Sequence, residues 1–241
     1  MDDRDLAARL TALEQELSRL RAELTNRDTR LRDLEDIEAI KRLQCAYGYY
    51  LEHAMTDEII DCFSTSPEVS ANFAEGTYLG PEGIRRHFEQ SRNMPNSYLH
   101  MVLQVSPVIT LDGDGMRAKG RWYGYGDIMF APTEPLDPSH IALIYEMEYV
   151  KENGDWKILT MKQNLIFLYR NGTGQPATQT GEKPIRPPVR QRPDLPAEYD
   201  TEYPSGYIFP MHYPHPVTGR PSTENEHNGT LTLGPSKRRP A

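Results

Sequence analysis

Two pairs of long apolar and β-branched segments, each joined by a tight turn, constrain the fold of this chain more than any other feature. The pairs are 98–111 with 116–129, and 140–151 with 156–169. The first turn is Asp-Gly-Asp-Gly and the second is Glu-Asn-Gly-Asp, and such turns favour hairpins because glycine and asparagine adopt positive φ readily. The sequence therefore predicts a long antiparallel meander whose strands bend around a cone-shaped cavity.

Helical patterns precede these strands. Apolar and aromatic residues recur at helical spacing over 37–54, and a shorter helical pattern covers 59–63. The sequence then predicts a short strand or hairpin arm over 69–78, and a short helix over 84–90 with Pro81 near its start. Helices followed by a meander predict an α+β domain over 36–170, with helices packed on one face of a curved antiparallel sheet.

Leucine recurs before residue 36 at alternating spacings of four and three residues. The stripe comprises Leu6, Leu10, Leu13, Leu17, Leu20, Leu24, Leu31 and Leu34. Arg27 interrupts it. This pattern predicts a helix over 1–35 that serves for self-association, and leucine at both seam positions leaves dimer and trimer open. The alternative is that the stripe packs on the chain's own globular domain.

Net charge and apolar run lengths exclude several classes of protein. The formal net charge of −8 argues against a nucleic-acid partner, because phosphate binding needs a basic face. No apolar run reaches the roughly 18 residues of a membrane helix, and the acidic start at 1–5 is unlike a signal peptide. We therefore expect a cytoplasmic protein with no membrane partner and with Cys45 and Cys62 as free thiols.

The last 71 residues, 171–241, differ in composition from the rest. They hold 13 of the 20 prolines, and an aromatic-rich stretch runs from Tyr199 to Tyr213. A fully disordered tail is poor in aromatic residues. We therefore predict an arm that wraps its own domain or a neighbouring subunit and covers a pocket. The alternative is a free peptide that binds another protein.

Four segments carry a resemblance to a known family. They are the run Tyr47–Phe63, the segment Gly76–Ile84, His100 followed by Pro107–Asp114, and Gly154–Ile158. In order and spacing they resemble the SnoaL-like branch of the nuclear transport factor 2-like superfamily, over about residues 36–170. The resemblance implies a cone-shaped α+β barrel with a deep apolar pocket. Members include cofactor-independent dehydratases, isomerases, cyclases and lyases, as well as non-catalytic binding proteins.

The resemblance also suggests roles for particular residues. It places a helix tyrosine at Tyr47, an acid at Glu52, and at His100 the strand histidine that often serves as general acid or base. Histidine has a pKa suited to proton transfer near neutral pH, and tyrosine protonates or polarises a leaving oxygen. We therefore predict His100, Tyr47 and Tyr50 as catalytic. The alternatives are a hydrogen-bonded sheet histidine and an aromatic core stripe.

Further polar residues are predicted to bind substrate. They are Glu52, His53, Tyr78, Arg121, Tyr123, Asp127 and Asn164. Arg121 and Tyr123 share one face of 117–129, and Arg121 binds an anion or phenolate if that face points inward. Alternation does not decide which face is inward. For His53 the alternative is a solvent-facing histidine at a helix end, and for Asp127 and Asn164 it is an ordinary polar position at a sheet edge.

These residues favour a cofactor-independent lyase that acts on a hydroxylated aromatic small molecule. The expected reaction is loss of water, or of formaldehyde as in SnoaL-like lyases acting on lignin-derived diarylpropane diols. We expect no cofactor and no metal, because the sequence has no zinc-type spacing and no phosphate-binding loop. The alternative is a non-catalytic ligand-binding or scaffold protein of the same fold.

Overall fold

The computed structural model describes residues 3–73, 75–93, 99–129, 139–170, 192–196 and 211–220. The chain forms two compact units, residues 1–39 and 40–241. In chain order, the elements are α1 (Asp3–Glu52), α2 (Thr56–Asp61), β1 (Ser70–Phe73), β2 (Gly76–Leu79), α3 (Gly80–Phe88), the 3₁₀ helix η1 (Glu89–Asn93), β3 (Leu99–Leu111), β4 (Arg117–Met129), β5 (Ser139–Glu152), β6 (Asp155–Arg170) and β7 (Leu195–Pro196).

Helix α1 does not end where the leucine stripe gives way to a different apolar face. It continues without a break to Glu52, so the predicted helices over 1–35 and 37–54 form one element. The boundary between the two units lies inside it, after Ala39. In the first unit the leucines from Leu10 to Leu34 are exposed, whereas in the second Ile40 and Tyr47 are fully buried.

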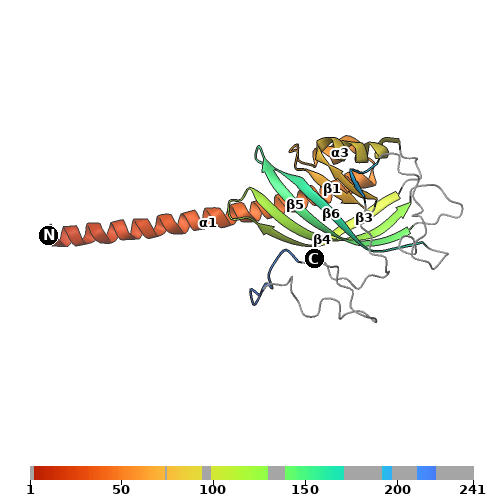
Figure 1. The fold of residues 1–241 in the computed structure, drawn as a ribbon. Helices are drawn as coiled ribbons and strands as arrows, with labels where there is room; N and C mark the ends of the chain where they lie inside the picture. The colour runs from red at the N-terminus through yellow and green to blue at the C-terminus, as the bar shows by residue number, and fades with distance from the viewer. Residues whose placement is uncertain are drawn as a thin grey trace. The chain divides into compact units, whose positions relative to one another are not determined.

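The sheet confirms the predicted antiparallel meander. Its strand order is β3-β4-β5-β6-β1-β2-β7, and β3 to β6 are joined by successive antiparallel pairings. The turn between β5 and β6 places Asn153 and Gly154 at φ of 53° and 93°, as its Asn-Gly sequence predicts. Strand β1 is the exception, because it pairs with β6 in parallel. Figure 1 shows the long strands curving as one unclosed sheet.

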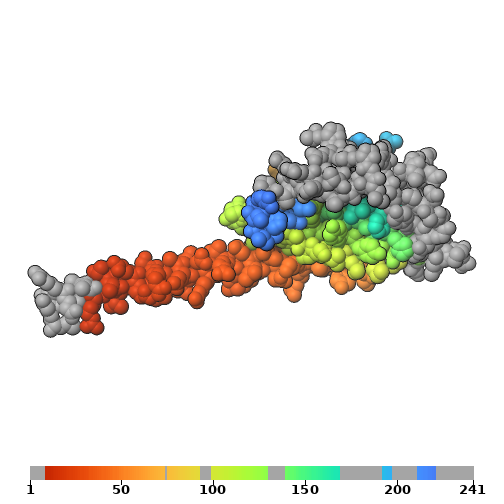
Figure 2. Space-filling model, turned by 90° about the horizontal axis from the view of Figure 1, so that it is seen from below, coloured from red at the N-terminus to blue at the C-terminus, as the bar shows by residue number. Residues whose placement is uncertain are grey.

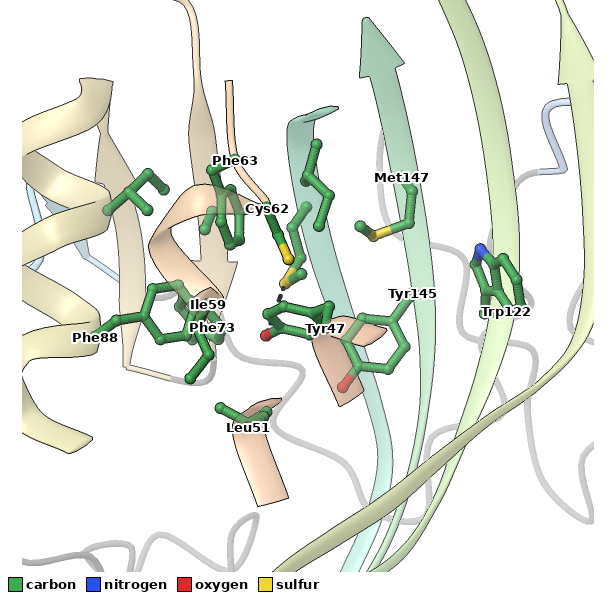
Figure 3. Close-up of a cluster of buried hydrophobic side chains, with 14 of the residues drawn as sticks. Tyr47, Leu51, Ile59, Cys62, Phe63, Phe73, Phe88, Trp122, Tyr145 and Met147 are labelled. Atoms are coloured by element: carbon green, nitrogen blue, oxygen red, sulfur yellow. Dashed lines mark hydrogen bonds between the residues drawn. The ribbon is translucent and has the colours of Figure 1, made fainter. Parts of the chain in front are cut away.

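Helices cover one face of this sheet, which confirms the α+β class. We call this face, which carries Val102, Trp122, Tyr145 and Met161, the inner face, and the opposite one the outer face. In the close-up of Figure 3, Tyr47 of α1 lies among buried side chains from α2, α3 and the inner face. Burial of each such aromatic or aliphatic side chain stabilises the folded state by roughly 1.5–3 kcal/mol.

Two pieces of the proline-rich arm contact the second unit's own sheet. Strand β7 pairs with β2, and Asp194 Oδ2 accepts bonds from Leu79 N at 2.8 Å and Arg86 at 2.6 Å. The backbone N–H of Leu79, and secondarily Arg86, hold the pKa of Asp194 below its ordinary value.

Residues 211–220 lie against the outer face, where His212 Nδ1 is 3.4 Å from Glu146 Oε2 (Figure 2, blue segment). The aromatic residues from Tyr199 to Phe209 lie outside the described residues. That the arm covers a pocket stays a prediction.

Candidate functional site

The structure decides which face of β4 points inward. Trp122 is buried on the inner face, and its neighbours on that face include Gly120 and Gly124. Arg121 and Tyr123 belong to the outer face, because they are register partners of Glu146 and Ile144 rather than of the buried residues of β5. The inward face is therefore the one built from glycine and tryptophan, and the predicted anion-binding arginine points the other way.

His100 lies on the inner face. It is half-buried near the start of β3, two residues before the buried Val102 and opposite the buried Ile128. Residues two apart on a strand share a face, so His100, Val102 and Gln104 form one inward row. Of the three predicted catalytic residues, His100 is the one that lies on a strand of the sheet, whereas Tyr47 and Tyr50 lie on α1.

Helix α1 runs along this inward row of β3. Gln44 donates from Nε2 to Gln104 Oε1. One turn later, a Cβ atom at Gly48 would stand 3.2 Å from Gln104 Nε2 and 4.0 Å from Val102 O. Glycine at this position allows the close approach of helix and strand.

The helix and the strand run in opposite directions along this contact. The helix advances from Gln44 to Gly48 as the strand partners recede from Gln104 toward Val102. Glu52 is one turn beyond Gly48 on the same helix face, and His100 is the next inward residue of β3. The last turn of α1, which carries the partly buried Glu52, therefore follows the same contact toward the end of β3 that carries His100.

A buried hydrogen-bond network continues from this contact. Trp122 Nε1 donates to the Tyr149 hydroxyl at 3.0 Å, and that hydroxyl donates to Gln44 Oε1 at 2.7 Å. Burial raises the pKa of Tyr149, so the phenol stays neutral and able to donate. Sequence reasoning missed Gln44 and Tyr149. The available signal was a glutamine on the otherwise apolar stripe of α1.

Tyr47 lies within the buried core, so its hydroxyl is not exposed as that of a catalytic residue at a pocket mouth would be. Its ring packs edge-on against Phe63 at 5.9 Å and Phe88 at 6.2 Å, and its hydroxyl lies 3.6 Å from Met161 Sδ (Figure 3). Its side chain is fully buried, whereas Tyr50 is partly buried and packs against the edge of the same core. The structure therefore assigns different depths to the two predicted tyrosines.

Two predicted substrate-binding residues are separate from the His100 row. Tyr78 is fully buried beside α3, where its ring centroid lies 4.6 Å from that of His87 and 5.8 Å from the Arg86 guanidinium carbon. His53 is exposed, and its Nδ1 lies 2.9 Å from Tyr49 O. The structure thus agrees with the alternative for His53, a solvent-facing histidine at a helix end.

The remaining four predicted residues lie on the outer face. Arg121 is buried there in an ion pair with Glu146, and Asp127 is paired with His140. Tyr123 is half exposed, and Asn164 stands opposite Ile144 of β5. These residues do not share a face with His100. Successive side chains of a strand point to opposite faces of the sheet, and the strand register places these four on the outer one.

Both cysteines are free thiols, as predicted. Burial raises the pKa of the Cys62 thiol to about 12, so a thiolate nucleophile is not available there near neutral pH. Among the described residues, no helix is long and apolar enough to cross a membrane.

The comparisons with known proteins agree with this architecture. A family model described as a SnoaL-like domain matches residues 32–162, more than half of the chain. The chain therefore belongs to the SnoaL-like domain family, and the resemblance inferred from sequence is confirmed.

Solved structures are similar at low sequence identity. A "Putative Scytalone Dehydratase" from Novosphingobium aromaticivorans is 16% identical, with 69% of this chain and 98% of that chain covered and a TM-score of 0.51. An NTF2-like protein with a cystatin-like fold from the same species is 17% identical (59% and 90% covered, TM-score 0.49). Hexachlorocyclohexane dehydrochlorinase LinA-type3 from Novosphingobium barchaimii is 16% identical (60% and 95% covered, TM-score 0.49). At 16% identity, the likeness to the first of these concerns the fold alone.

Proposed function

We propose that this protein is a cofactor-independent lyase-type enzyme that acts on a hydroxylated aromatic small molecule, with loss of water or of formaldehyde. The observation that carries the proposal is the position of His100 on the inner face, near the start of β3. Helix α1 lies along this strand at Gln44 and Gly48, and Glu52 is one helix turn beyond Gly48. A histidine on the inner face of the sheet is suited to proton transfer near neutral pH, and a carboxylate on the last turn of α1 is suited to orient its ring.

In the proposed reaction the neutral imidazole of His100 takes a proton from the substrate, and electrons shift to expel the leaving group. Glu52 acts as a positioning residue, since a carboxylate orients the ring and stabilises the imidazolium that forms. Tyr50 protonates or polarises the leaving oxygen. Tyr47, which lies deeper among Phe63 and Phe88, shapes the wall beneath the substrate.

An aromatic substrate fits the composition of the inner face. Trp122, Tyr145 and Tyr149 are buried there and give this side of the sheet an aromatic character. Aromatic rings stabilise one another in offset and edge-on contacts. The fold-level neighbour described as a scytalone dehydratase bears a name that denotes loss of water, which supports an elimination.

The test is turnover. We expect a screen of phenolic diols and related alcohols by mass spectrometry to find a product lighter by water or by formaldehyde. His100→Ala is expected to reduce turnover at least about a hundredfold, with an unchanged unfolding transition. The matched control is His140→Ala, which removes a histidine from the outer face. Equal rates for the two variants would contradict the assignment.

Glu52 has its own test. Glu52→Gln removes the carboxylate that is proposed to orient the His100 ring, so turnover is expected to fall about tenfold with an unchanged unfolding transition. Turnover equal to that of the wild type would contradict the proposed positioning role.

The second candidate function is non-catalytic binding of a small molecule. The packed aromatic surroundings and full burial of Tyr47 favour it, because side chains of the protein itself fill this part of the inner face. Calorimetric binding of a phenolic ligand without any product by mass spectrometry would support this candidate over the lyase.

A further inference from the structure

The leucine stripe of α1 is exposed in the first unit. Leu20 is the least exposed of the leucines between Leu10 and Leu34, at 43%, and Leu13 is the most exposed, at 66%. Each exposed leucine leaves apolar surface in water that association would bury. Apart from Arg27, which stands at one seam position, the stripe keeps a spacing of four and three, which is the seam of a left-handed coiled coil rather than a broad amphipathic face.

The charged residues beside this seam identify its partner. With Leu10 at heptad position a, the g positions are Arg9, Glu16, Glu23 and Arg30. The e positions are Glu14, Arg21, Asp28 and Glu35. In a parallel pair of identical helices, each g residue faces the e residue five positions later on the other helix. Arg9 then faces Glu14, Glu16 faces Arg21, and Arg30 faces Glu35, so three of the four contacts join opposite charges.

The fourth contact, Glu23 with Asp28, joins like charges, but it coincides with the interruption of the stripe. Arg27 occupies the seam position between these two acids and supplies the compensating positive charge. Within one helix, Arg19 Nη1 also bonds Glu23 Oε1 at 2.5 Å. Arginine buries its stem while its charged group reaches the rim of a seam, so Arg27 and Arg19 offset part of the repulsion in this layer.

An antiparallel pair does not give this complementarity. The alignment that overlaps the whole stripe sets Leu10 against Leu34 of the other helix, and e then faces e while g faces g. Glu14 meets Asp28, and Arg21 and Glu23 each meet their own copies. Most contacts in that arrangement are repulsive.

We propose that residues 10–34 bind a second copy of this chain as a parallel, in-register, two-stranded coiled coil. Two strands are favoured over three because the Arg27 guanidinium reaches water from the rim of a two-helix seam more readily than from the enclosed core of three helices. The argument uses only α1 and its charges, so it stands apart from the proposed lyase activity. Failure to find a substrate would leave it untouched.

Sedimentation equilibrium of the full-length protein tests the association. The wild-type chain of 27.6 kDa is expected to sediment at about twice that mass. Leu24→Glu places a charge in the seam and is expected to weaken the dimer at least about a hundredfold. The matched control, Thr25→Glu, adds the same charge at the neighbouring position off the seam and should keep the dimer. A monomeric or trimeric wild type, or a dimeric Leu24→Glu variant with unchanged affinity, would overturn the proposal.

Cross-linking tests the orientation. In a Cys45→Ser background, Leu10→Cys faces its own copy only in the parallel arrangement, and mild oxidation is expected to give a disulfide-linked dimer. Ser18→Cys, which lies off the seam, is the control and should remain largely uncross-linked. Reaction of Leu10→Cys with an added Leu34→Cys chain instead of with itself would indicate the antiparallel pair and overturn the proposal.

Charge exchange tests the register. Arg30→Glu alone puts two acids together at each Arg30–Glu35 contact and is expected to weaken the dimer about tenfold. The double variant Arg30→Glu with Glu35→Arg restores opposite charges and should recover the affinity. A double variant as weak as the single one would contradict the proposed register.

Discussion

The two faces of β4 differ in a way that its sequence does not suggest. The outer face presents Arg121, Tyr123 and Tyr125, which look like binding residues, whereas the inner face includes three glycines beside Trp122. Yet the inner face is the buried one, and Tyr123 and Tyr125 are 50% and 56% exposed.

The reason lies in the neighbouring strand β5. A Cβ atom at Gly124 would stand 2.8 Å from both Leu143 Cδ1 and Tyr145 Cε2, and one at Gly120 would stand 2.9 Å from Tyr149 Cε2. The glycines leave room for large side chains that arrive from β5. A strand face can therefore be lined by its neighbour's side chains, and the polarity of its own residues then predicts little.

Among the substitutions that test this difference between the two faces of β4, Gly126→Ala is expected to change the unfolding free energy most. A Cβ atom there would lie 1.8 Å from the backbone oxygen of Met101, so Gly126→Ala forces β3 and β4 apart. We expect a loss of about 3 kcal/mol of unfolding free energy, measured by urea denaturation. Tyr125→Thr, the adjacent outer-face control, should cost less than about 1 kcal/mol. Equal losses would remove the distinction between the faces.

The next effect concerns the buried network. Tyr149→Phe removes the hydroxyl shared by Trp122 Nε1 and Gln44 Oε1 and leaves both groups buried without that partner. We expect a loss of about 2 kcal/mol in unfolding free energy. Tyr123→Phe removes a half-exposed hydroxyl from the outer face and should be near neutral. A neutral Tyr149→Phe would show that the network contributes nothing.

A smaller effect is expected on the outer face. Glu146→Gln removes the carboxylate that pairs with buried Arg121 and faces His212. Because these side chains keep some access to solvent, we expect a loss of about 1–2 kcal/mol rather than the larger cost of a fully buried pair. Glu148→Gln on the same face is the control. Limited proteolysis should also cut the segment 211–220 faster in Glu146→Gln if Glu146 anchors it.

The smallest effect is at the edge formed by β2 and β7. The pKa of Asp194 is lowered in the folded protein, chiefly by the Leu79 N–H. Its stabilising effect is therefore complete above the ordinary aspartate pKa of about 4 and is lost as pH falls through the lower native value. The difference in unfolding free energy between the wild type and Asp194→Asn should shrink from pH 6 to pH 2. A constant difference would contradict the ionic origin of this contact.

The fold was predictable where local chemistry decides it. The Asp-Gly and Asn-Gly turns set two hairpins, and β4 and β6 follow from them with nearly the predicted bounds. The parallel pairing of β1 with β6 was not predictable, because no turn joins these strands. The continuity of α1 was also missed, since the change of apolar period at residue 36 reflects different surroundings and not a helix end.

The candidate site was predictable only in part. The resemblance pointed to His100, and alternation places it in one row with Val102 and Gln104, as the structure has it; its catalytic role stays a prediction. Arg121, Asp127 and Asn164 were grouped with it by residue type, and the register then placed them on the other face. Gln44 escaped notice because its role depends on Gln104 and Tyr149, which are far away in sequence.

By itself, the sequence determined the helix and strand types, the hairpin turns, the α+β class and the heptad seam, because each depends on residues close together in the chain. Only the tertiary structure decided which side of β4 is inward, how deep Tyr47 lies, and which residues of α1 lie along the inward row of β3. The first depends on strand pairing, where a shift of one residue in register would exchange the two faces, and the other two depend on how α1 packs on the sheet.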